Sequence, residues 1–202
     1  MPRSFTEGQN QFLENEMDSK NDSKSGWNFA GSVPDALWGK AAAITLPPMG
    51  TPRADILKGS DSIDGIYGLG GNDTIYGNGG GDVLAGAAGN DRIYGGAGAD
   101  TFFFDTKLNA KTNVDRIMDF TLGEDKFGLS RHIFSKLKAS RVLKEDAFHV
   151  GKKAHDASDR IIYDKGTGAL YYDPDGTGSA KQIKFAVLAN KALLTYADFA
   201  VN

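Results

Sequence analysis

A nine-residue period running from Gly50 to Phe103 constrains the fold of this chain more than any other feature of its sequence. The six consecutive segments are GTPRADILK, GSDSIDGIY, GLGGNDTIY, GNGGGDVLA, GAAGNDRIY and GGAGADTFF. Each segment begins with glycine, carries aspartate at its sixth position and has an apolar residue at its eighth. These coincident columns indicate a repeated structural unit, because a linker has no reason to keep an apolar side chain in fixed register with an acid.

The segments resemble the nonapeptide repeat G-G-x-G-x-D-x-U-x of the RTX (haemolysin-type) calcium-binding proteins. The fourth position is glycine in the last four segments, but Arg53 and Ser62 occupy it in the first two. The resemblance implies an all-β fold, in which a parallel β-roll of nonapeptide repeats is followed by a C-terminal β-rich capping region with a minor helix.

The spacing also predicts where a metal would bind. A six-residue turn and a three-residue strand make half a coil, so aspartates eighteen residues apart should stack one strand spacing apart, about 4.8 Å. Glycines at the first and fourth positions would allow the positive-φ backbone that turns carbonyl oxygens inward. Carbonyls and carboxylates together suit Ca²⁺ better than Mg²⁺, zinc or copper. We therefore expect Ca²⁺ to be bound by Asp64, Gly71, Asp73, Gly80, Asp82, Gly89, Asp91, Gly98 and Asp100.

The eighth position is the apolar one that each half-coil reliably buries, so the predicted core of the roll is a thin column. Such a core cannot offset the conformational entropy of ordering a glycine-rich chain. Calcium binding should therefore contribute directly to folding.

Composition divides the chain into three predicted parts. A partly disordered N-terminal segment, 1–49, contains Trp27 and Trp38, the calcium-binding roll spans 50–105, and a C-terminal capping region spans 106–202. Their formal charges are −2, −5 and +4, so the glycine-rich part is the acidic one, which favours a cation partner over nucleic acid. The chain has no cysteine, no apolar run long enough to span a bilayer and no N-terminal leader pattern.

The segment after the repeats resembles the part that closes the roll in secreted RTX proteins. Its pattern is D-x-I-x-D-F-x-x-G-x-D-K, starting at Asp115. The aspartates of this pattern, Asp115, Asp119 and Asp125, could either bind a further calcium or cap turns. Further on, RIIYD, ALYYD and QIKFAVL are strand-like, and the alternation of Ile183, Phe185 and Val187 with polar or small residues predicts a half-buried antiparallel strand.

The ending LLTYADFAVN, with the hairpin before it, is similar to the C-terminal regions of proteins exported by bacterial type I secretion. That similarity implies an uncleaved C-terminal signal, type I secretion machinery as a partner, and a secreted, extracellular location. Taken alone, Thr195 and Asp198 would also make an ordinary helix-capping pair.

No catalytic pattern accompanies the repeats. The serralysin-type zinc proteases, which carry similar repeats, have a catalytic domain, but H-E-x-x-H, G-x-S-x-G and G-K-[ST] are all missing here. The three histidines, His132, His149 and His155, lack the i, i+4 pairing of zinc hydrolases. The sequence predicts a non-enzymatic, secreted calcium-binding protein. Two alternatives stay open: a polysaccharide-binding module, for which Tyr76 and Tyr94 could form a platform, and the export and folding part of a larger secreted hydrolase.

Overall fold

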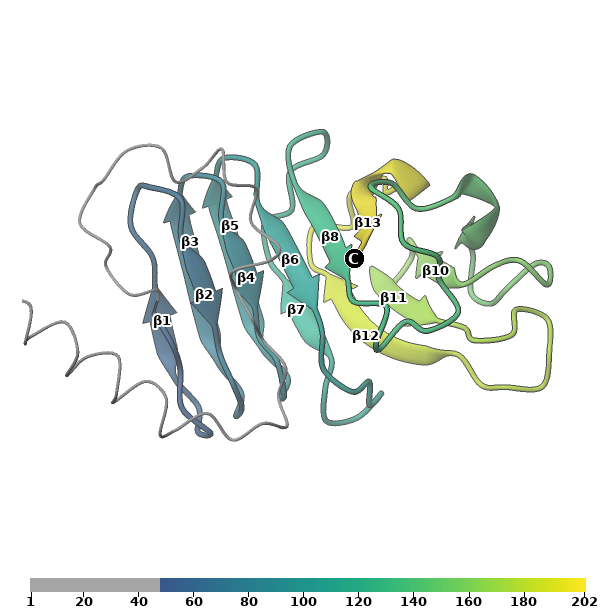
Figure 1. The fold of residues 1–202 in the computed structure, drawn as a ribbon, viewed down its shortest axis with the longest axis horizontal. Helices are drawn as coiled ribbons and strands as arrows, with labels where there is room; N and C mark the ends of the chain where they lie inside the picture. Colours follow the sequence, from purple (N-terminus) through teal and green to yellow (C-terminus); the bar gives the residue numbers. More distant parts are fainter. Residues whose placement is uncertain (1–47) are drawn as a thin grey trace, which may run out of the picture. The chain divides into compact units, whose positions relative to one another are not determined.

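The computed structural model describes residues 48–202, whose strands form two sheets connected as a parallel β-roll (Figure 1). The expectations for the N-terminal segment, including both tryptophans, lie outside the described residues. The repeats supply the first strands, which alternate between the two sheets. They are β1 (Ile56–Lys58), β2 (Gly65–Tyr67), β3 (Thr74–Gly79), β4 (Val83–Ala85), β5 (Arg92–Ala97) and β6 (Thr101–Phe104).

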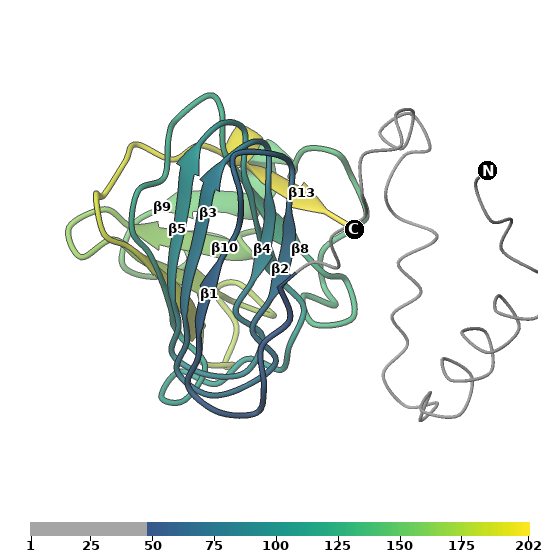
Figure 2. The same ribbon diagram turned by 90° about the vertical axis from the view of Figure 1, so that its left-hand side faces the viewer.

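Strands two apart in the chain pair in parallel with a register of eighteen residues. Ile75 of β3 pairs with Ile93 of β5, and Ile66 of β2 pairs with Leu84 of β4. Seen along the roll, the two sheets face each other and the turns run along both edges (Figure 2). The predicted eighteen-residue coil is therefore confirmed.

The eighth position of the repeat fills the space between the sheets. Successive side chains of a strand point to opposite faces, so the side chain at this position points inward while those of its two neighbours point outward. From the second repeat onward these residues are at most 2% exposed: Ile66, Ile75, Leu84, Ile93 and Phe102. Leu57, in the first repeat, is partly buried against the same column.

The roll does not stop where the nine-residue period ends. Two further strands, β7 (Asp115–Ile117) and β8 (Lys126–Leu129), pair in parallel with β5 and β6. Ile117 and Phe127 continue the buried column. The closing segment thus adds one more full coil to the roll.

The remaining chain caps this last coil and extends both sheets. Its elements are η4 (Glu145–Ala147), β9 (Phe148–Val150), β10 (Ile161–Asp164), β11 (Ala169–Tyr172), β12 (Ile183–Leu188), η5 (Tyr196–Asp198) and β13 (Phe199–Val201). β12 pairs in parallel with β7 and β13 with β8. The sheet orders are β1-β3-β5-β7-β12-β11-β10-β9 and β13-β8-β6-β4-β2. The three predicted strands are confirmed as β10, β11 and β12, which pair antiparallel in that order.

Aromatic rings fill the junction between roll and cap. The Phe127 ring stacks between Phe120 and Phe199, with centroid distances of 4.8 and 4.9 Å. Because Phe199 belongs to the last strand, the C-terminal strand contributes directly to the core of the last coil.

The predicted alternation along β12 holds only in part. Phe185 and its neighbour Ala186 are both buried, whereas Val187 is half-buried. The register with β11 shifts between Leu170 and Tyr171, and this irregularity reverses the inward and outward phase of the strand.

A capping pair starts the short helix before the last strand. Asp198 accepts a hydrogen bond from the Thr195 backbone N–H at 2.7 Å, while the Thr195 hydroxyl accepts one from Ala197 N–H at 3.3 Å. The expected capping role of Thr195 and Asp198 is confirmed.

Candidate metal sites along the turns

The turns of the repeats lie along the two edges of the roll, where the chain crosses from one sheet to the other. Turns 68–73 and 86–91 lie on one edge and lead into β3 and β5. Turns 77–82 and 95–100 lie on the other edge and lead into β4 and β6. Each turn is therefore stacked on the turn eighteen residues away.

The sixth-position aspartates form a hydrogen-bonded ladder on each edge. Asp73 N–H donates to Asp91 Oδ1 at 2.7 Å, and Asp82 N–H donates to Asp100 Oδ1 at 2.9 Å. The same bond joins the aspartates of the first two repeats to the ladders, from Asp55 N–H to Asp73 Oδ1 at 2.8 Å and from Asp64 N–H to Asp82 Oδ1 at 2.9 Å. The predicted stacking of aspartates eighteen residues apart is confirmed.

The second carboxylate oxygen has no such partner in the four later repeats. These side chains are about 1% exposed, and among the described residues their Oδ2 atoms accept no hydrogen bond: Asp73, Asp82, Asp91 and Asp100. A buried carboxylate oxygen without a partner is costly. A cation beside each Oδ2 would remove that cost.

The first-position glycines are required for a reason different from the expected one. Gly68 and Gly77 do not have positive φ. Instead, a Cβ on Gly77 would collide with both Asp82 Oδ2 and the carbonyl oxygen of Gly95. Because glycine has no side chain, Asp82 Oδ2 and the carbonyl oxygen of Gly95 can both face the space beside Gly77. This space, lined by the two oxygens, is called the oxygen cradle.

The fourth-position glycines behave as predicted. The φ angles of Gly71 and Gly80 are 105° and 115°, and those of Gly89 and Gly98 are 150° and 126°. A Cβ on Gly89 or Gly98 would collide with the carbonyl oxygen of the equivalent glycine in the preceding coil.

The second position also needs a left-handed backbone, although no column of glycines marks it in the sequence. Leu69, Asn78 and Ala87 adopt φ of 70°, 76° and 67°, and Gly96 has 97° at the same place. Conformations of this kind are costly for residues with a Cβ and persist only where surrounding structure enforces them.

Burial raises the pKa values of the ladder aspartates. Loss of hydration brings the pKa of Asp82 to about 6, a rise opposed by its hydrogen bond from Asp64 N–H and assisted by the charges of Asp100 and Asp64. Burial likewise raises the pKa of Asp91 to about 6, and it raises the pKa values of Asp73 and Asp100. Burial therefore disfavours the ionised form of the ladder carboxylates, and a bound cation would stabilise that form.

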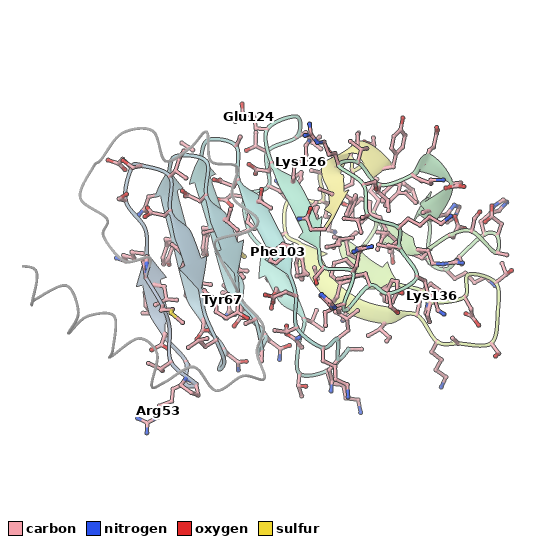
Figure 3. The ribbon with its side chains drawn as sticks, in the orientation of Figure 1. Arg53, Tyr67, Phe103, Glu124, Lys126 and Lys136 are labelled. Carbon is pink, nitrogen blue, oxygen red and sulfur yellow. The ribbon has the colours of Figure 1, made fainter. Side chains whose placement is uncertain are left out.

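In the first two repeats the second carboxylate oxygen has hydrogen-bond partners. Asp64 Oδ2 accepts hydrogen bonds from the Ser60 backbone N–H at 2.6 Å and from its hydroxyl at 2.8 Å. Asp55 has the same two bonds with Thr51. Arg53, which replaces the fourth-position glycine, points away from the strands (Figure 3). The second oxygen of the first two aspartates thus already has partners within its own turn.

Two further aspartates join the ladders beyond the repeats. Asp115 Oδ1 accepts a hydrogen bond from Asp91 N–H at 3.2 Å, and Asp125 Oδ1 accepts one from Asp100 N–H at 3.0 Å. Burial raises the pKa values of both carboxyls. The residues DRI and DKF repeat the aspartate-x-apolar signal of the nonapeptides, but at separations of 24 and 25 residues, so a fixed period does not find them.

Asp119 caps a turn in this segment. Its carboxylate accepts hydrogen bonds from Gly95 N–H at 2.9 Å and Gly96 N–H at 3.2 Å. All three aspartates of the closing segment therefore bond to backbone N–H groups.

The donor set along both edges consists of carboxylate and carbonyl oxygens. Oxygen ligands in a flexible arrangement suit Ca²⁺, while the missing nitrogen and sulfur disfavour zinc and copper at these turns. The residues therefore fit calcium, with Oδ2 of a ladder aspartate and a first-position carbonyl as the atoms that face the shared space.

The outer face of β3 and β5 carries the two tyrosines. Tyr76 and Tyr94 are paired in register, and their rings stack at 4.8 Å with an interplanar angle of 15°. Lys58 Nζ lies 5.8 Å from the centroid of the Tyr76 ring.

Within residues 48–202, no helix is both long and apolar enough to cross a bilayer.

Comparisons with known proteins agree with this geometry. The model of the RTX calcium-binding nonapeptide repeat, in four copies, matches residues 49–84 and 76–106. The chain matches no curated protein. Two solution structures of subunits of the Azotobacter vinelandii mannuronan C5-epimerase are similar in fold. The AlgE6R3 subunit is 25% identical, with a TM-score of 0.52, over 80% of this chain and 86% of that chain. The AlgE6R2 subunit is 28% identical, with a TM-score of 0.50, over 76% and 91%.

Proposed function

We propose that this chain, whose residues 49–106 form RTX calcium-binding nonapeptide repeats on a parallel β-roll, is a secreted protein that folds on binding Ca²⁺ outside the cell. The observation that carries the proposal is the row of four buried Oδ2 atoms that accept no hydrogen bond from the described residues; those of Asp73 and Asp82 also face a carbonyl oxygen of the next coil beside a first-position glycine. We assign calcium binding to Asp73, Asp82, Asp91 and Asp100 with carbonyls of the turns, including Gly71, Gly80, Gly89 and Gly98. Asp64 should contribute less, because its Oδ2 is bonded within its own turn.

The energetics support folding that depends on calcium. The roll has a thin apolar column, and its glycines lose much conformational entropy on ordering. With free calcium at ten times the dissociation constant, each site adds about 1.4 kcal/mol of stability. Three such sites would add about 4 kcal/mol, which is comparable to the whole stability of a marginal domain.

Circular dichroism during a calcium titration tests this proposal. Strand signal and melting temperature should rise with Ca²⁺ and fall again with a chelator. Replacing Asp73, Asp82 and Asp91 together by alanine should abolish the response. A full strand signal in chelator, unchanged by calcium, would refute calcium-dependent folding.

We also propose that residues 106–202 carry an uncleaved type I secretion signal. Support comes from the similarity of the chain's ending to such regions. Because β12 and β13 belong to the two sheets of the roll, truncation would also damage the fold, so a fusion is the sharper experiment. Residues 106–202 fused to a cytoplasmic carrier should direct it to the medium in cells with a type I transporter. Equal export without the transporter would contradict the proposal.

The chain's role is proposed to be non-catalytic. Its ladder carboxylates are assigned to calcium, and a carboxylate committed to a metal is not free to transfer protons. Assays for mannuronan epimerisation and for glycoside hydrolysis by the calcium-loaded chain should give no turnover, and measurable turnover would overturn this part.

Binding of an anionic polysaccharide is a second candidate function. The stacked pair Tyr76 and Tyr94 offers an aromatic surface, and the exposed Arg92 and Arg116 are paired in register on the same outer face. The similar structures are subunits of an enzyme that acts on mannuronan, a polymer of uronic acids. Aromatic and cationic side chains together would contact sugar rings and carboxylates.

Retention on immobilised mannuronan tests the second candidate. The calcium-loaded protein should be retarded, and Tyr76→Ala with Tyr94→Ala should lose retardation while keeping the calcium response. Equal elution of wild type and variant would reject this surface.

A further inference from the structure

Two imidazoles and a carboxylate come together at the sheet edge farthest from β1. His149 lies in the middle of β9, the edge strand, while His155 and Asp159 lie in the loop that leads to β10. One ligand atom from each of the three side chains lies within 4.8 Å of the other two. No sequence pattern predicts this cluster, because the spacing of the two histidines differs from the helical pairing of zinc hydrolases.

The two rings are held side by side. Their centroids are 5.4 Å apart, and the rings are nearly parallel, at 16°. A Cβ on Gly151 would lie 2.6 Å from His149 Nε2, so the glycine leaves room for that ring. Asp156 Oδ2 lies 3.6 Å from His155 Nδ1, an arrangement in which a carboxylate orients an imidazole for a metal at its other nitrogen.

Asp159 is a buried carboxylate that forms no ion pair. It is 4% exposed, and its Oδ2 accepts hydrogen bonds from His155 N–H at 2.6 Å and Asp156 N–H at 3.0 Å. The ion pairs within residues 48–202 join Lys126 to Asp198 and His155 to Asp156, and neither includes Asp159. A buried acid beside two imidazoles is suited to a cation that accepts nitrogen as well as oxygen ligands.

The loop that carries the cluster is hydrogen-bonded to neighbouring segments at both of its ends. Gly151 N–H donates to Tyr163 O at 3.0 Å, and Arg160 N–H donates to Ala147 O at 2.9 Å. Between them, Lys152 O accepts a hydrogen bond from the Gln182 side chain at 2.9 Å. The backbone of the loop is therefore held in place before any metal binds, which lowers the entropic cost of binding.

We propose that His149, His155 and Asp159 form a site for a divalent transition metal, represented by Zn²⁺, separate from the calcium sites of the turns. Zinc bonds of about 2.0–2.2 Å place tetrahedral ligand atoms about 3.4 Å apart. The His155 side chain is 73% exposed, so its rotation can close the remaining distance. Three protein ligands leave a fourth position for water or for a group from a partner.

Calorimetric titration of the full, calcium-saturated chain with ZnCl₂ tests the site. Calcium saturation occupies the oxygen ligands of the turns, and the chain has no cysteine to compete. The wild type should bind one equivalent of Zn²⁺. His155→Ala and His149→Ala should each weaken binding at least tenfold, because one of three ligands is removed. Co²⁺ should give a visible absorption band typical of four-coordinate geometry in the wild type, and this band should disappear in both variants.

His132→Ala is the matched control, because His132 is the remaining histidine of the chain and is exposed. It should bind Zn²⁺ like the wild type. Unchanged calcium-induced circular dichroism in all three variants would establish that they fold. Equal Zn²⁺ affinity in wild type and His155→Ala, or no saturable binding by the wild type, would overturn the site without bearing on calcium.

Discussion

Replacing Asp82 by asparagine tests whether this aspartate binds calcium or only supports its turn through a hydrogen bond. The asparagine keeps Oδ1, which accepts the hydrogen bond from Asp64 N–H at 2.9 Å. It replaces the unpartnered Oδ2 with an uncharged NH₂ group. The change therefore removes a charge from the oxygen cradle while leaving the ladder bond in place.

The magnitude follows from the linkage between binding and folding. One site contributes about 1.4 kcal/mol when free calcium is ten times the dissociation constant. In a domain of this size, 1 kcal/mol shifts the melting temperature by about 2–4 °C. With calcium, Asp82→Asn should therefore melt about 3–6 °C below the wild type. Without calcium it should be at least as stable as the wild type, because a buried charge next to Asp64 and Asp100 has been removed.

Differential scanning calorimetry in calcium and in chelator measures both effects. Asp64→Asn is the matched control, because that carboxylate bonds to Ser60 in its own turn. We expect it to lower stability by a similar amount, about 1 kcal/mol, in both conditions. If Asp82→Asn is destabilised equally with and without calcium, or if Asp64→Asn loses the same share of the calcium response, the assignment of Oδ2 to calcium is wrong.

Three other perturbations test the remaining reasoning. First, in chelator the stability of the roll should rise as the pH falls through about 6 towards 4, because the pKa values of Asp82 and Asp91 are raised to about 6 and the folded state then binds more protons than the unfolded state. In calcium the apparent affinity should fall over the same range, and urea titrations in chelator that show no rise in stability between about pH 6 and 4 would contradict the raised pKa values. Second, Phe127→Ala should cost about 3–5 kcal/mol in urea unfolding with calcium, because its fully buried ring stacks between two others; a loss below 1 kcal/mol would mean that the cap does not stabilise the roll. Third, Gly77→Ala should lower thermal stability by about 1–3 kcal/mol and weaken calcium binding, because its Cβ collides with the cradle oxygens. Gly70→Ala is the control, since its nearest atoms would lie 3.7 Å away, and equal effects of the two substitutions would exclude the cradle.

The local repeat was enough to predict the coil, the stacked aspartates and the buried column. Each of these depends on a fixed register of eighteen residues, and the sequence displays that register directly. The pairing of Ile75 with Ile93 is therefore predictable from the sequence alone.

Other features depend on contacts that no local pattern encodes. The first-position glycines are needed because of an aspartate side chain five residues later, not because of their own φ. Asp115 and Asp125 join the ladders after longer connections, which hide them from a search with a fixed period. The pairing of β12 with β7 and the meeting of His149 with His155 are likewise set by tertiary packing.

The cap contacts the roll through its last coil, where β12 pairs with β7 and β13 with β8. The earlier coils are joined to each other by one unvarying register. Because each coil contacts its neighbours in the same way, the number of coils does not affect how the cap packs on the last one. Duplicating eighteen residues would add one layer of about 4.8 Å and one more rung to each acidic ladder, with the cap unaltered. The fold therefore allows the number of calcium sites to change by duplication of an eighteen-residue segment, because the added coil would repeat contacts that the existing coils already make.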